Sequence, residues 1–314
     1  MPTNKPDLER LGTEEQNPIS AELDAKPALE IARIINAEDA KVAAAVQVAL
    51  PKIAEAIDAV AQAIGNGGRL IYVGAGTSGR IAALDASECP PTFNTDPETV
   101  DFVMAGGVKA LYTAVEGEED DAELGRHDIG KKKPARGDVV AGLTASGRTQ
   151  YTVAAVEYAK TRGARTVGIT CNRNSALGQL ADIEIVAEVG PEVLSGSSRM
   201  KAGTAQKMIC NMITTGAMAR LGYVYGNLMV NVHLKNEKLV ERGIGILMRA
   251  AGVDRQAAER ALKDSDNSVP VALVMLKARV SEAEARQHLE LAGGHVRKAI
   301  DTAMPLSARR SSRT

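Results

Sequence analysis

The chain has 314 residues, of which 45% are hydrophobic and 25% charged, a composition typical of globular proteins with a packed core. Its 38 basic and 39 acidic residues nearly cancel, which excludes the strong basic field that nucleic-acid binding requires. The three cysteines are far apart and form no Cys-x-x-Cys pair, and no run reaches the roughly 18 uncharged apolar residues of a membrane span. The N-terminus is polar and does not resemble a signal peptide. Together these features predict a cytoplasmic protein without nucleic-acid or membrane partners.

The N-terminal part of the sequence predicts an arm followed by helix. Residues 1–20 are rich in Pro, Glu, Asn and Thr, which is typical of an extended arm. Apolar residues then recur at helical spacing from Ala28 to Ile64. Pro51 should start a new helix or kink this one, and the "GNGG" run at 65–68 should end it.

Five short apolar, β-branched runs follow, and they begin at residues 69, 100, 138, 165 and 183. Helical patterns lie between most of them, so the sequence predicts an α/β fold with a parallel sheet flanked by helices on both faces. Continuous apolar runs are typical of strands that are buried on both faces. A long helix, apolar nearly all round, is predicted from residue 199 and should pack against the sheet or a second subunit.

After about residue 240 the sequence predicts short, charged, Ala-rich helices without strand signals. Three segments, 252–266, 268–279 and 281–300, indicate a separate three-helix unit. We therefore divide the chain into an arm and helix at 1–50, an α/β domain at 51–235, a helical domain at 240–303 and a loose basic tail at 304–314.

Three loops rich in hydroxyl side chains stand at predicted strand or helix ends. The first has the G-x-G-x-x-G pattern, but no acidic residue ends the second strand to bind a ribose, which disfavours a dinucleotide site. Free N–H groups and the dipole at a helix N-terminus favour an anion instead. Ordinary helix caps would explain one such loop, whereas three together predict a site for a monophosphate and a polyol. The candidate ligands in the three loops are Thr77 and Ser78, then Thr144, Ser146, Arg148 and Thr149, then Ser198 and Lys201.

The motifs around these loops resemble those of sugar isomerase (SIS) domains and, more closely, of the N-acetylmuramic acid 6-phosphate etherases. The similar stretches are "GAGTSGRIAALDASECPPTF", "AVEGEEDD", "ASGRTQY" and "GSSRMKAGTAQKMICNM". The resemblance extends over most of the chain, from "NPIS" near residue 17 to "GGHVRKAI". It implies an SIS-type, phosphosugar-binding α/β domain and a small C-terminal helical domain similar to ubiquitin-associated (UBA) domains.

The resemblance also implies a reaction. The family removes the D-lactyl ether from C3 of N-acetylmuramic acid 6-phosphate by elimination and water addition, in peptidoglycan recycling, and needs no metal or other cofactor. Glu88 matches the family's proton donor to the departing lactate, and Glu119 matches its second carboxylate. Glu118 stands where the family pattern has alanine, which leaves the choice among Glu116, Glu118 and Glu119 open.

By the same resemblance, Ser78, Thr144, Ser146 and Thr149 would hold the phosphate. Arg148 and Lys201 are candidates for the lactyl carboxylate or the enolate, although Lys201 could equally cap a helix or pair with an acid. A homodimer is expected, because sites in such domains often form between subunits. Two alternatives stay open: a phosphosugar-binding regulator related to the glucokinase regulatory proteins, and a phosphosugar isomerase.

Overall fold

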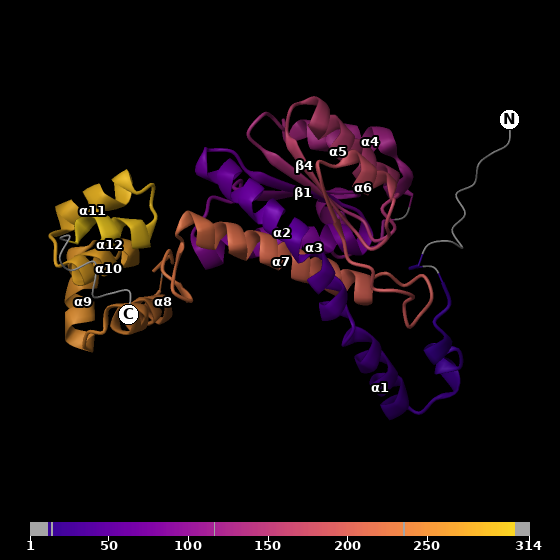
Figure 1. Cartoon of the computed structure of the whole chain (residues 1–314), viewed down its shortest axis with the longest axis horizontal. Coiled ribbons are helices and arrows are strands. Elements are labelled where there is room, and N and C mark those ends of the chain that lie inside the picture. Colours follow the sequence, from indigo (N-terminus) through magenta and orange to yellow (C-terminus); the bar gives the residue numbers. More distant parts are fainter. Residues whose placement is uncertain (1–11, 14, 116, 235, 305–314) are drawn as a thin grey trace. The chain divides into compact units, whose positions relative to one another are not determined.

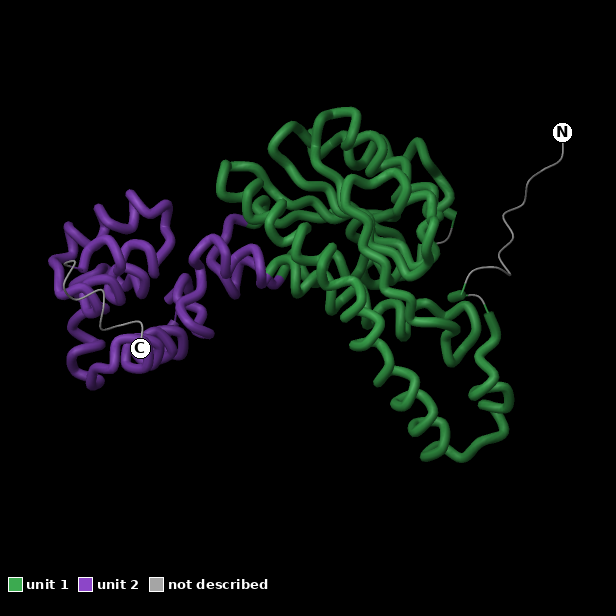
Figure 2. Tube along the Cα trace, viewed as in Figure 1, with its two compact units in different colours: residues 1–87, 97–214 green, residues 88–96, 215–314 purple. Residues whose placement is uncertain are grey.

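The computed structural model describes residues 12–13, 15–115, 117–234 and 236–304. Glu116, most of the N-terminal arm and all of the predicted basic tail except Met304 lie outside these ranges. The chain divides into two compact units (Figure 2): unit 1 is Met1–Ser87 with Pro97–Thr214, and unit 2 is Glu88–Asp96 with Thr215–Thr314. Within the described ranges, no helix combines the length and the apolarity that crossing a bilayer requires.

A five-stranded sheet forms the centre of unit 1, and all four strand pairs in it are parallel. Its strands are β1 (Leu70–Gly74), β2 (Val100–Met104), β3 (Val139–Leu143), β4 (Arg165–Thr170) and β5 (Ile183–Val186), in the order β2-β1-β3-β4-β5. All five predicted runs are strands, and the predicted α/β fold is confirmed. From β1 the chain passes to β2 at the edge of the sheet and then crosses to β3, on the other side of β1. The loops that follow β1 and β3 therefore run in opposite directions and leave a crevice between them.

Helices cover both faces of this sheet (Figure 1). One face carries α2 (Val42–Gly65), α3 (Gly76–Phe93) and α7 (Lys201–Leu221), and the other carries α4 (Ala122–Lys131), α5 (Gln150–Thr161) and α6 (Ala176–Leu180). Side chains alternate along each strand. Ile71 and Val73 therefore join the core beneath α4, α5 and α6, while Tyr72 bonds to Asp85 of α3 on the opposite face. Burial on both faces explains why the central strands β1 and β3 are apolar throughout.

The helix boundary near the N-terminus differs from the prediction. No new helix starts at Pro51, which lies inside α2; the break falls at Ala40 and Lys41, after α1 (Ala28–Asp39). Pro51 and Gln47 are both exposed, so the Gln47 carbonyl that loses its helical partner can bond to water. The buried stripe of α2, which includes Val46 and Ile53 on either side of the proline, stabilises a continuous helix.

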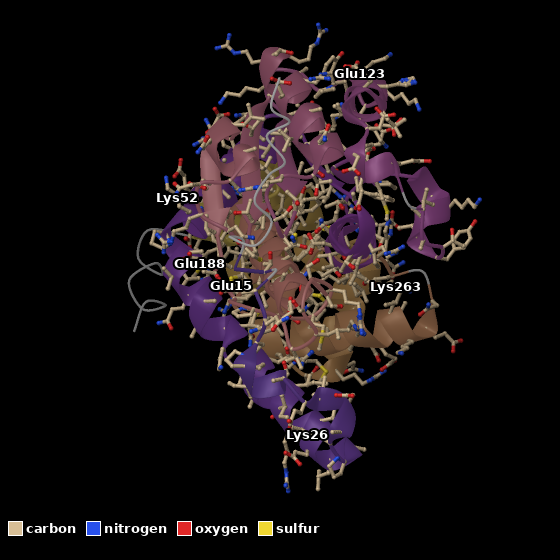
Figure 3. The ribbon with its side chains drawn as sticks, turned by 90° about the vertical axis from the view of Figure 1, so that its right-hand side faces the viewer. Glu15, Lys26, Lys52, Glu123, Glu188 and Lys263 are labelled. Carbon is tan, nitrogen blue, oxygen red and sulfur yellow. The ribbon has the colours of Figure 1, made fainter. Side chains whose placement is uncertain are left out.

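Short 3-10 turns and surface charges complete unit 1. The turns are Pro18–Ser20, Leu23–Ala25, Gly107–Leu111 and Glu118–Asp120. Charged side chains such as Lys52, Glu123 and Glu188 point outward (Figure 3), and each forms an ion pair with a neighbour at the surface. Exposed pairs of this kind contribute little to stability, about 0–1 kcal/mol each.

Besides the ends of α3 and α7, the described part of unit 2 contains a short hairpin, β6 (Val224–Tyr225) and β7 (Leu228–Met229), and five whole helices. These are α8 (Glu237–Ala251), α9 (Arg255–Asp264), α10 (Val269–Ala278), α11 (Glu282–Leu291) and α12 (Val296–Ala303), around a core of buried aliphatic side chains. The prediction of a single helical segment at 281–300 was wrong. Gly293 and Gly294 both adopt positive φ, +61° and +82°, which ends α11 and lets His295 cap α12.

Candidate active site

A pocket of about 370 Å³ lies at the carboxyl ends of β1 and β3 in unit 1. This is the point where the strand order reverses, and α/β sheets commonly bind ligands there. The volume lies at the lower end of the range for small-molecule sites. The pocket is lined by Thr13, Ala75, Gly76, Thr77, Ser78, Glu119, Asp120, Thr144, Ala145, Ser146, Arg148, Thr149, Gln150 and Ser198.

The first hydroxyl loop connects β1 to α3 with only Ala75 between them. A Cβ atom on Gly74 would lie 2.7 Å from the Gly79 amide nitrogen, and one on Gly79 would lie 2.9 Å from the Gly74 carbonyl oxygen. The two glycines are therefore required for the close approach between the strand end and the first turn of the helix. As a result, the half-buried Thr77 and Ser78 line the pocket from the N-terminal turn of α3, where the unpaired N–H groups of a helix favour an anion.

The second loop places a cluster of hydroxyl groups opposite the first. The Thr144 Oγ1 atom lies 2.8 Å from Thr149 Oγ1 and 3.3 Å from Ser146 Oγ, and the Arg148 backbone N–H donates to Ser146 Oγ. Thr149 is the N-cap of α5, but its side chain makes no capping bond to that helix and bonds to Thr144 instead. Two helix N-termini and a hydroxyl cluster thus surround one pocket, an arrangement that favours an anionic group.

The third loop separates two residues that stand close together in the sequence. Ser198 lines the pocket, whereas Lys201 is only 1% exposed and its Nζ lies 2.7 Å from Glu38 Oε2. Of the possibilities that the sequence left open for Lys201, the structure shows a pair with an acid. A contact between Lys201 and a substrate would require this pair to open.

A buried polar network anchors the loop that carries Ser198. Glu192 accepts hydrogen bonds of 3.0 Å from the Lys201 and Ala202 backbone N–H groups and so caps α7. Asn17 Nδ2 donates to Glu38 Oε2 and to the carbonyl oxygen of Pro191. Burial raises the pKa of Glu38, but hydrogen bonds from Lys201, Lys41 and Asn17 outweigh it and lower the pKa to about 2. Glu38 therefore stays ionised at neutral pH.

The candidate carboxylates occupy different places. Glu119 lines the pocket from the turn Glu118–Asp120 and is exposed, as is its neighbour Asp120. Glu118 is half-buried and does not line the pocket. Glu88 is exposed near the end of α3 and does not line the pocket either. It follows Ser78 by ten helical residues, which corresponds to roughly 15 Å along the helix.

All the predicted site residues except Glu88 and Lys201 line the pocket. Sequence reasoning missed Thr13, Asp120 and Gln150. Gln150 directly follows the second hydroxyl loop and could have been included as the first residue of its helix. Thr13 comes from the N-terminal segment, where its Oγ1 accepts a hydrogen bond from Asn172, and no local pattern indicates this long-range contact. Among the described residues, no group of His, Cys, Asp and Glu could hold a metal ion.

Curated relatives match this chain over nearly its whole length. The chain is 52% identical to the N-acetylmuramic acid 6-phosphate etherase of Aeromonas hydrophila, over 92% of this chain and 97% of that protein. It is also 52% identical to the etherase of Streptomyces avermitilis, over 95% and 96% of the two chains. The chain belongs to the N-acetylmuramic acid 6-phosphate etherase family. Clostridium beijerinckii provides a more distant member, 48% identical over 93% of this chain.

Parts of this etherase family member also match two domain families and a solved structure. Residues 52–160 match the family "Glucokinase regulatory protein N-terminal SIS domain", and residues 131–216 match "SIS domain". A candidate phosphosugar isomerase involved in capsule formation from Bacteroides fragilis superposes with a TM-score of 0.50 at 18% identity, over 66% of this chain and 98% of that one. This last similarity shows a shared fold.

Proposed function

We propose that the protein cleaves the D-lactyl ether of N-acetylmuramic acid 6-phosphate to N-acetylglucosamine 6-phosphate and D-lactate, as a carbon–oxygen lyase of peptidoglycan recycling. The observation that carries this proposal is the identity of about one half with curated etherases along nearly the whole chain. The pocket supports it, because its hydroxyl groups and helix N-termini suit a sugar phosphate.

In this proposal the phosphate binds between the two hydroxyl loops. Ser78, Ser146 and Thr149 would donate hydrogen bonds to its oxygens, and the N-termini of α3 and α5 would stabilise its charge. Thr144 would orient Ser146 and Thr149, to which its hydroxyl is already bonded. Arg148, exposed at the edge of the pocket, is our candidate for the lactyl carboxylate.

The reaction needs two groups that transfer protons. Ring opening gives an aldehyde, which makes the C2 proton acidic because the resulting carbanion delocalises into the carbonyl group. A base then removes that proton, and an acid assists the departure of lactate from C3 before water adds back. We assign these steps to Glu119, which lines the pocket, and to Glu88, as the proton donor to lactate.

The separation between Ser78 and Glu88 along α3 is an argument for a homodimer. Because Glu88 lies roughly 15 Å along the helix from Ser78, we propose a homodimer in which the site is completed by a second copy of the chain. The three cysteines, which are far apart in the sequence and all buried, support a cytoplasmic location. We also propose 51–235 as the phosphosugar-binding domain and 240–303 as an accessory helical domain.

The decisive experiment measures D-lactate release from N-acetylmuramic acid 6-phosphate by the purified protein without added metal or nucleotide. Stoichiometric D-lactate and N-acetylglucosamine 6-phosphate are expected. A second candidate, a regulator that binds phosphosugars without turnover, is favoured by the match of residues 52–160 to the glucokinase regulatory protein domain. Tight binding without release would support that regulator, and isomerisation without release would support an isomerase.

A further inference from the structure

Gln206 is a buried residue of α7 that contacts the phosphate loop from behind. It is 1% exposed, and its Oε1 accepts a hydrogen bond of 2.9 Å from the Ser78 hydroxyl. One turn earlier on the same helix, Gly203 lies beside the same loop, since a Cβ atom there would be 3.5 Å from Thr77 Cγ2. Helix α7 is therefore packed directly against the first turn of α3.

The hydrogen bond between Ser78 and Gln206 has the wrong direction for binding an anion. A serine hydroxyl has one proton, and here that proton points inward, so Ser78 offers only lone pairs to the pocket. Phosphate oxygens are acceptors and would be repelled by these lone pairs. Meanwhile, the Nε2 group of Gln206 is buried and has no hydrogen-bond partner among the described residues.

A half-turn of the Gln206 amide group resolves both problems. Nε2 would then donate to Ser78 Oγ, and the released hydroxyl proton could be donated to an oxygen of the phosphate. The amide oxygen loses its partner in exchange, but a buried carbonyl group tolerates this better than a buried N–H group does. An anion in the pocket stabilises the second arrangement further.

We propose that Gln206 is a positioning residue that donates its Nε2–H to Ser78 and thereby turns the Ser78 hydroxyl into a donor for the bound phosphate group. This inference rests on the proposed phosphosugar site and adds a specificity determinant outside the pocket lining. It predicts that Gln206 affects phosphosugar affinity only through Ser78.

The test is a double-mutant cycle on the binding of N-acetylglucosamine 6-phosphate, measured by calorimetry. Gln206→Met keeps the length of the side chain but removes both polar groups, and Ser78→Ala removes the hydroxyl. Each single change should weaken binding about tenfold, and the double variant should bind no more weakly than Ser78→Ala. Gln179→Met, an exchange on the exposed side of α6, is the control and should leave the affinity unchanged.

Gln206→Glu provides a second, independent variant at the same position. While it is ionised, the carboxylate of this variant can only accept, so it fixes the Ser78 proton inward, and binding measured at alkaline pH should be weaker than in Gln206→Met. Additive effects in the cycle, or wild-type affinity in either variant, would overturn the role of Gln206 while the phosphosugar site stands. A wild-type protein that fails to bind N-acetylglucosamine 6-phosphate would overturn both proposals.

Discussion

Replacing Lys201 by methionine removes the buried cation from the network that anchors the Ser198 loop. Lys201 and Glu38 have side chains that are 1% and 3% exposed, and 2.7 Å separates Lys201 Nζ from Glu38 Oε2. Lys41 also pairs with Glu38, but its side chain is 58% exposed. The same carboxylate thus has one buried and one solvated cationic partner, so Lys41→Met is a matched control.

Two estimates give similar magnitudes for the loss. Leaving a buried charge without its partner typically costs about 3–5 kcal/mol. The pKa of Glu38 lies at about 2 instead of its ordinary 4.5, which corresponds to about 3 kcal/mol of stabilisation of the ionised form, to which Lys201, Lys41 and Asn17 all contribute. The solvated Lys41 pair should contribute less than about 1 kcal/mol.

Scanning calorimetry can follow the transition of unit 1 in each variant. For a unit of this size, roughly 2–4 °C in Tm corresponds to 1 kcal/mol, so a cost of about 3–5 kcal/mol in Lys201→Met should lower the Tm by about 6–20 °C. Lys41→Met should lower it by less than about 4 °C. The double variant Glu38→Gln with Lys201→Met should recover much of the loss, because no unpaired charge is then buried.

The pH dependence supplies a further check. The folded pKa of Glu38 is depressed, so its stabilisation is complete above pH 4.5 and is lost as the pH falls toward 2. The gap in Tm between wild type and Lys201→Met should therefore shrink over that range. A Tm for Lys201→Met no lower than that for Lys41→Met, or a gap that persists unchanged at pH 2, would refute the reasoning.

Three other predictions concern the glycine loop, the proposed proton donor Glu88 and the thiols. Gly79→Ala places a Cβ 2.9 Å from the Gly74 carbonyl oxygen and should destabilise the protein by about 1–3 kcal/mol, measured as a lower Tm. An unchanged Tm would contradict the close approach of the end of β1 to the first turn of α3. Glu88→Gln should abolish D-lactate release yet retain exchange of the C2 proton in deuterated water, and loss of exchange with lactate release retained would contradict its role as the acid. All three cysteines are buried, and burial, aided by the charge of Glu192, raises the pKa of Cys171 to about 12. A thiol reagent at pH 8 should therefore label the cysteines only after unfolding, and rapid labelling of the native protein would contradict this.

Local sequence patterns were sufficient for most of the fold. The five strands and the long helix from residue 199 follow from runs and periods of apolar residues, which record how each segment is buried. Hydroxyl residues next to glycines, at the ends of two strands, indicated the two hydroxyl loops that line the pocket, because the backbone shape of such loops is set locally. Their backbone geometry depends on neighbours in the sequence.

The structure decided the features that depend on residues far apart in the chain. A proline inside a helix usually kinks or ends it, yet Pro51 lies within α2. Its exposed position lets water bond to the Gln47 carbonyl group that loses its helical partner. Thr13 enters the pocket through a bond to Asn172, which is distant in the sequence.

The ion pair between Lys201 and Glu38 shows the difference between what the sequence determines and what the tertiary structure determines. The sequence by itself determined that a lysine follows the third hydroxyl loop and that Glu38 lies in a segment with helical spacing from Ala28 to Ile64. Only the tertiary structure brought Lys201 and Glu38 together in the interior and left Ser198 at the pocket. The physical reason is that an ion pair is specified by distance and burial, and neither is encoded in the residues next to it.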